Sequence, residues 1–198
     1  MKLELDPYVI SKFLTENQNP LWTKRSKRRP TDEVIQITNC SQMNGMFMHS
    51  RGLGDLAKHL HIVDCVRDHD LDFVAISEAG RRDIPVHVLN RLSGGLDFTW
   101  HCLPPRGRSG GILLGVKTNS MEVLAFSDGD FHIKCHIRNK ADNFTWSLVA
   151  VYGAAQDAHK SAFLRELVNL AKDNLYPILI GGDFNLLRFS HEKSNDHF

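Results

Sequence analysis

The stretch Ile180-Gly181-Gly182-Asp183-Phe184-Asn185 is the most informative part of the sequence. An apolar run, Pro177 to Ile180, leads through two glycines to an acid and an amide two residues apart. This pattern predicts a buried strand with a polar end, and in extended backbone Asp183 and Asn185 point the same way. On a functional reading the carboxylate orients water or holds a hard metal ion, the amide binds phosphate oxygens, and the glycines let a ligand approach the backbone. On the other reading this is a Gly-Asp turn with a capping Asn.

Two more polar side chains follow apolar, strand-like runs further upstream. Glu78 comes directly after Leu71–Ser77, and Tyr152 ends the run Phe144–Tyr152. An acid at the mouth of a core strand is where open α/β sheets place ligands. Taken singly, each residue also has a structural explanation, because strand ends are often polar and tyrosine there is commonly a half-buried packing residue.

The pattern of apolar residues predicts an α/β or α+β sandwich and not a Rossmann alternation. Asp55 is expected to cap a helix, and Asp157 a second one that runs to about Lys172. The run Phe131–Ile137 alternates, which places His132 and His136 on a solvent-exposed face. The other expected elements are a helix at Pro85–Leu92 and strands at Phe98–Leu103, Gly111–Val116 and Met121–Phe126. The buried face of the first helix is expected to carry Leu56, Leu60, Val63 and Val66.

Composition excludes several classes of protein. The 198 residues are 42% hydrophobic and 24% charged, which argues against a disordered or fibrous chain. A formal net charge of +1 gives no global field for a nucleic acid or a membrane, so any such binding needs a local patch. The four cysteines contain no C-x-x-C pair, which disfavours a zinc cage and a disulfide framework and favours a reducing intracellular compartment. No stretch approaches the roughly 18 apolar residues of a membrane span.

The first 44 residues are expected to be a poorly ordered basic extension, and residues 45–198 the folded domain. Apolar periodicity is weak in this extension, and five basic residues lie within six positions of it. Such a run is typical of a nuclear-localisation or nucleic-acid-binding patch, and equally of a solvated basic linker. These basic residues are Lys24, Arg25, Lys27, Arg28 and Arg29.

Taken as a set, the strand-end residues Glu78, Tyr152, Asp183 and Asn185 resemble the motifs of the endonuclease/exonuclease/phosphatase superfamily. More narrowly, the chain resembles the apurinic-type endonuclease domain of plant non-LTR (LINE-type) retrotransposons. The segments that carry the resemblance are Arg51–Gly54, Ser77–Arg81, Gly107–Gly115, Val149–Gly153, Gly181–Asn185 and Glu192–Asn195.

The resemblance implies a four-layered α/β sandwich that is incomplete at its C-terminus, and hydrolysis of DNA phosphodiesters with Mg²⁺ or Mn²⁺. By position, Glu78 is implied as the metal ligand, and Asp183 as the group that orients or deprotonates water. Asn185 is implied to position phosphate or water, and Tyr152 to touch the scissile phosphate. DNA is the implied partner, with no membrane, no small-molecule cofactor and no specific protein partner.

Two departures from the family pattern affect the expected activity. His49 stands where the family has an Asn that helps to set the metal site, and an imidazole suits softer metals better than Mg²⁺. Members of the family also continue past the segment at which this chain stops. We therefore expect a truncated endonuclease that is impaired or inactive.

Other readings stay open. One alternative is a non-catalytic nucleic-acid-binding or interaction remnant whose affinity comes from the basic run. Another is phosphatase or RNA deadenylase activity, because the superfamily spans those substrates. Arg106 and Arg108 are candidate contacts to a DNA backbone, although the glycines beside them also fit close strand packing.

Overall fold

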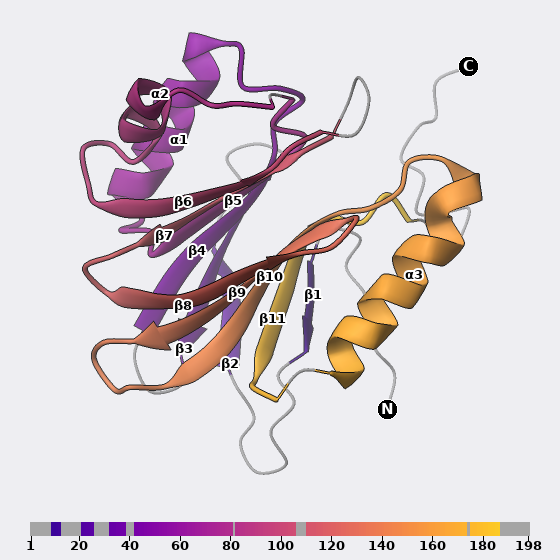
Figure 1. Cartoon of the computed structure of the whole chain (residues 1–198). Helices are drawn as coiled ribbons and strands as arrows, with labels where there is room; N and C mark the ends of the chain where they lie inside the picture. Colours follow the sequence, from indigo (N-terminus) through magenta and orange to yellow (C-terminus); the bar gives the residue numbers. More distant parts are fainter. Residues whose placement is uncertain are drawn as a thin grey trace.

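The computed structural model describes residues 9–12, 21–25, 32–38, 42–80, 82–105, 110–173 and 175–186, and for the first three ranges only the backbone. Two β-sheets pack face to face, and helices cover their outer faces (Figure 1). The six-stranded sheet has the order β2-β3-β4-β5-β7-β6, and the five-stranded sheet the order β1-β11-β10-β9-β8. The bounds of the strands are β1 Val9–Lys12, β2 Leu21–Arg25, β3 Asp32–Thr38, β4 Gln42–His49, β5 Phe73–Ser77, β6 Phe98–Leu103, β7 Ile112–Lys117, β8 Met121–Asp128, β9 His132–Asn139, β10 Thr145–Tyr152 and β11 Ile178–Asp183. The helices are α1 Leu56–Asp68, α2 Val86–Leu92 and α3 Asp157–Lys172.

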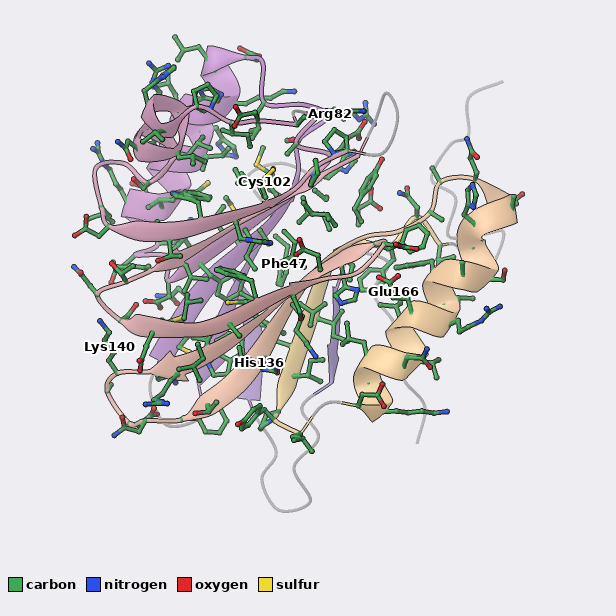
Figure 2. All side chains as sticks on the ribbon, in the orientation of Figure 1. Phe47, Arg82, Cys102, His136, Lys140 and Glu166 are labelled. Carbon is green, nitrogen blue, oxygen red and sulfur yellow. The ribbon has the colours of Figure 1, made fainter. Side chains whose placement is uncertain are left out.

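Three apolar clusters separate four layers. Between the sheets, Phe47 and Phe73 of one sheet meet Trp146 and Leu179 of the other, and all four are buried. Figure 2 shows Phe47 in this central layer. A second cluster joins the six-stranded sheet to α1 and α2, and a third joins the five-stranded sheet to α3. The four-layered α/β sandwich expected from the sequence is confirmed.

The buried face of α1 differs from the expected one. Asp55 does cap the helix, because its side chain accepts a hydrogen bond from the Ala57 amide. However, Leu56 and Leu60 are both 55% exposed, and the buried face includes His59 and Ile62 instead. The His59 Nε2 atom lies 2.9 Å from the Leu53 carbonyl oxygen, and this bond turns the imidazole inward. At α3, Gln156 occupies the cap position, and Asp157 is the first helical residue.

Three strands described by their backbone fall within the first 44 residues, and β2 and β3 pair antiparallel beside β4. Strand β4 itself crosses the expected boundary at residue 45. The division into an extension and a domain stays a prediction. In the described ranges, no helix combines the length and the apolar character needed to cross a bilayer.

Glu166 links α3 to the turn between β8 and β9 (Glu166 is labelled in Figure 2). Its carboxylate accepts hydrogen bonds from the backbone amides of Asp130 (3.1 Å) and Phe131 (2.9 Å), and from the His132 ring. The expectation that His132 is exposed is therefore wrong: its residue is 8% exposed, because α3 covers that face of the sheet. Burial alone raises the pKa of Glu166, but the bonds from His132, Phe131 and Asp130 outweigh it, so the pKa lies below its usual value.

We predict that Glu166→Gln lowers the free energy of unfolding at pH 7 by about 1–2 kcal/mol, after allowance for partial exposure to water. A carboxyl whose folded pKa is lowered stabilises the fold above its unfolded pKa, near 4.3 for Glu, and this stability is lost as pH falls through the folded value. The difference between wild type and variant should therefore shrink below about pH 4.3. Urea unfolding at a series of pH values, monitored by circular dichroism, measures the free energy of unfolding of both proteins.

The control is Glu122→Gln, whose carboxylate lies 3.5 Å from Arg138 in an exposed ion pair. This variant should change the free energy of unfolding by less than about 0.5 kcal/mol at any pH. A Glu166→Gln effect of the same size at pH 7 and at low pH would show that shape, and not charge, anchors the helix.

Candidate functional site

Two parallel strand pairs, one in each sheet, bring the candidate residues together. Strands β4 and β5 run parallel with His49 opposite Ser77, and β10 and β11 run parallel with Tyr152 opposite Asp183. Glu78 follows β5 directly. Because these four strands end at the same edge of the sandwich, the side chains of His49, Glu78, Tyr152 and Asp183 form one cluster.

His49 bridges the two sheets within this cluster. Its Nε2 atom lies 2.8 Å from Glu78 Oε2, and its Nδ1 atom lies 3.0 Å from Asp183 Oδ2. The ring also stacks on Tyr152, with centroids 6.2 Å apart and planes 18° apart. The altered metal site expected at His49 stays a prediction. Sequence reasoning missed this bridge, because the bridge depends on a partner in the other sheet.

A tight turn after β4 holds the backbone of Glu78. The Gly52 amide donates to the Glu78 carbonyl oxygen at 2.7 Å, and the buried Ser50 hydroxyl donates to the same oxygen at 2.9 Å. Arg51 and Glu78 both have positive φ, +49° and +55°. Non-glycine residues rarely adopt this left-handed conformation, and such strain persists only where neighbouring bonds enforce it.

Lys58 of α1 holds that turn from the other side. Its ammonium group donates to the carbonyl oxygens of Ser50 (2.6 Å), Gly52 (2.9 Å) and Arg51 (3.3 Å). Sequence reasoning missed this residue. The available signal was a lysine in the first turn of a helix, where the helix dipole disfavours a cation unless it has other partners.

Asp183 and Asn185 lie together for a different reason from the expected one. Strand β11 ends at Asp183, and Asn185 has a φ of +48°, so the backbone does not stay extended. Instead, the Asn185 amide donates to Asp183 Oδ1 at 3.0 Å, which forms an Asx turn. The Asn185 side chain then donates to the Gly153 carbonyl oxygen at 2.9 Å and joins the turn to the end of β10.

The two glycines before Asp183 serve packing. A Cβ on Gly181 would collide with the Phe47 ring, and one on Gly182 would collide with the backbone of Val151 in the neighbouring strand. Gly182 also has a φ of +131°. We expected these glycines to let a ligand approach the backbone. In the structure, they instead allow neighbouring strands and the two sheets to come close together.

Tyr152 carries a neutral phenol at the centre of the cluster. Burial raises its pKa, and the charges of Glu78 and Asp183 raise the pKa further, while a side-chain hydrogen bond with Asn185 lowers it in part. The net shift is upward, so the hydroxyl keeps its proton at neutral pH and can donate a hydrogen bond to an anion.

A cavity of about 470 Å³ adjoins Tyr152 on the side of α3. Its walls include Leu103 and Phe131, and its polar lining includes Gln156 and His159 near the start of α3. The cavity and the carboxylate cluster therefore share Tyr152 as a common wall.

The donor atoms suit a hydrated ion better than a caged one. Among the described residues, no three His, Cys, Asp or Glu side chains converge to hold a metal ion. The Glu78 and Asp183 side chains are 24% and 14% exposed, so water reaches both carboxylates. Mg²⁺ keeps several waters and takes only one or two carboxylates in proteins, so these residues fit it.

Among the residues that the structure describes, no candidate nucleic-acid-binding side chain belongs to this cluster. Lys24 and Arg25 belong to β2, which pairs with β3 and not with β4, and only their backbone is described. The other five, Lys27, Arg28, Arg29, Arg106 and Arg108, lie outside the described residues.

Comparison with solved structures finds proteins of the same fold at low sequence identity. The human Nocturnin catalytic domain with bound sulfate anion has a TM-score of 0.50 and 14% identity, over 68% of this chain and 60% of that one. A humanized D. rerio TDP2 has a TM-score of 0.52 and 13% identity, over 66% and 59%. A conserved protein of unknown function from Enterococcus faecalis has a TM-score of 0.51 and 13% identity, over 70% and 65%. The chain thus spans less than two thirds of the length of each.

A search of curated proteins finds no match to the chain. The sequence profile of the Endonuclease/Exonuclease/phosphatase family matches residues 39–196, which include all five residues of the cluster and its Asx turn. The chain therefore belongs to the Endonuclease/Exonuclease/phosphatase family.

Proposed function

We propose that this chain is a DNA endonuclease domain of the plant LINE-type retrotransposon branch, which hydrolyses phosphodiester bonds with Mg²⁺ or Mn²⁺. The observation that carries the proposal is the meeting of Glu78, Tyr152, Asp183 and Asn185 at the strand ends of both sheets. The retrotransposon branch rests on the sequence segments Arg51–Gly54 and Glu192–Asn195.

Asp183 is suited to accept the proton of an attacking water. Its Oδ1 is held by the Asn185 amide and its Oδ2 faces His49, so the carboxylate has a fixed orientation. In hydrolysis, the water oxygen forms a bond to phosphorus while the bond to one ester oxygen breaks. The water proton passes to Asp183, and the departing oxygen takes a proton from solvent.

Tyr152 and Asn185 are suited to bind the phosphate. The Tyr152 phenol is a neutral donor, and charge develops on the non-bridging oxygens as water attacks, so a fixed donor stabilises the transition state more than the ground state. Glu78 and Asp183 are the residues that would hold the cation. When bound, Mg²⁺ supplies Lewis-acid polarisation of the phosphate.

The cavity beside Tyr152 favours a phosphodiester over a free phosphate ion. Its volume of about 470 Å³ leaves room for an organic group attached to the phosphate. DNA as the substrate and a nuclear location are parts of this proposal, and the basic run from Lys24 to Arg29 supports both by its composition.

We predict that the purified chain nicks supercoiled plasmid with Mn²⁺ or Mg²⁺, and that EDTA or Asp183→Asn lowers the rate by at least about 10²-fold. The amide keeps an acceptor for the Asn185 amide hydrogen but cannot take a proton. Gel electrophoresis of the relaxed product gives the rate, and circular dichroism checks that each variant folds.

The control is Asp64→Asn, which changes an exposed acid of α1 and should leave the nicking rate unaltered. A folded chain that binds DNA but does not nick it with either metal would contradict hydrolysis. That result would favour a non-catalytic nucleic-acid-binding remnant.

Tyr152→Phe tests the phosphate donor separately. Loss of one positioned donor to a developing negative charge typically costs about 10²-fold in rate. We expect a decrease of this size at saturating DNA, with DNA affinity measured by fluorescence anisotropy changed far less. Tyr176→Phe is the matched control, because Tyr176 is 43% exposed and precedes β11 at the end opposite Asp183. Equal rates for Tyr152→Phe and wild type would exclude the phenol from the reaction.

A further inference from the structure

The His49 ring presents both of its nitrogen atoms to carboxylates of the candidate site. Nε2 lies 2.8 Å from Glu78 Oε2 and Nδ1 lies 3.0 Å from Asp183 Oδ2. An imidazole that ligates a metal ion directs one nitrogen lone pair at the ion and commonly gives its other N–H to a second group. Here neither nitrogen faces open space, so the ring as held is not placed as a ligand.

The ring also lies between the two carboxylates that would hold the cation. Glu78 comes from one sheet and Asp183 from the other, and each directs an oxygen to a different edge of the same imidazole. The two carboxylates are 24% and 14% exposed, and the ring lies within hydrogen-bond distance of both.

Other contacts keep the ring in this place. Tyr152 stacks on one of its faces at 6.2 Å, and the buried Ser77 hydroxyl lies 3.5 Å from Nδ1. Displacement of the ring therefore breaks its contacts with two carboxylates and disturbs a ring stack. Bonds to charged groups are the stronger class of hydrogen bond, so this displacement carries a substantial cost.

We propose that His49 competes with the divalent cation for Glu78 and Asp183 and is not one of its ligands. The proposal rests on the proposed function in that the same two carboxylates hold the cation. It assigns His49 the role of a residue that lowers the affinity of the site for divalent cations, since an ion must displace the ring to bind.

The test measures metal binding by the full chain without DNA, so it does not depend on hydrolysis. Isothermal titration with MgCl₂ and with MnCl₂ is carried out on wild type, His49→Asn and His49→Ala. Both variants are expected to bind each metal about tenfold more tightly or better, because no ring has to be displaced. His87→Asn, an exposed histidine of α2, should bind as wild type does.

The two substitutions separate competition from ligation. Tighter binding by His49→Asn alone would mean that the new amide is a ligand, and it would overturn the proposal. Weaker binding by both variants would show that the imidazole is itself a ligand, and unchanged or absent binding by both would show that it does not compete. Each of these three results is incompatible with the proposal.

A measurement on the unaltered chain covers the case in which a variant fails to fold. The ¹⁵N resonances of the His49 ring are followed by NMR during titration with MgCl₂. Competition predicts that they move toward the values of an imidazole without carboxylate partners as Mg²⁺ binds. Fixed His49 resonances, with Mg²⁺ binding established by calorimetry, would overturn the proposal. Both measurements are made without DNA, so a failure of the wild-type chain to nick plasmid does not alter their outcome.

Discussion

The parallel pairing of β4 with β5 and of β10 with β11 is the constraint on which the candidate site depends. Each pair lies inside a different sheet, yet the ends of all four strands reach the same edge of the sandwich. Phe47, packed against Gly181, sets how closely the two sheets approach beside this edge. Without both pairings and this contact, the acids after β5 and at the end of β11 would have no common neighbour.

Backbone hydrogen bonds hold the site in conformations that the residues do not favour by themselves. Positive φ angles at Arg51, Glu78 and Asn185 cost about 1–3 kcal/mol each. Bonds from Ser50 and Gly52 to the Glu78 carbonyl oxygen offset this cost on one side, and the Asx turn at Asp183 does so on the other. The Lys58 ammonium donates hydrogen bonds to the carbonyl oxygens of Ser50 and Gly52 in the turn after β4.

Periodicity predicted most of the strands and helices after residue 47, because buried strands and capped helices leave periodic signals, and the family resemblance predicted the four layers. The sequence also identified Glu78, Tyr152 and Asp183 as strand-end residues that the structure brings together. It failed where a long-range partner decides the outcome. His59 turns inward for a carbonyl oxygen, His132 is covered by Glu166 of α3, and the glycines before Asp183 meet Phe47 and Val151. None of these partners is visible in local spacing.

Assembly of the site and its ability to take a cation are separate properties in this fold. The turns that shape it are built from backbone hydrogen bonds and depend on no ion. One side chain, His49, by contrast, contacts an oxygen atom of each of the two carboxylates. A substitution of His49 is therefore expected to alter cation binding and to leave the assembly of the site intact. Strand-end acids in a sequence of this family are therefore weaker evidence for hydrolysis when a neighbouring side chain already contacts both of them.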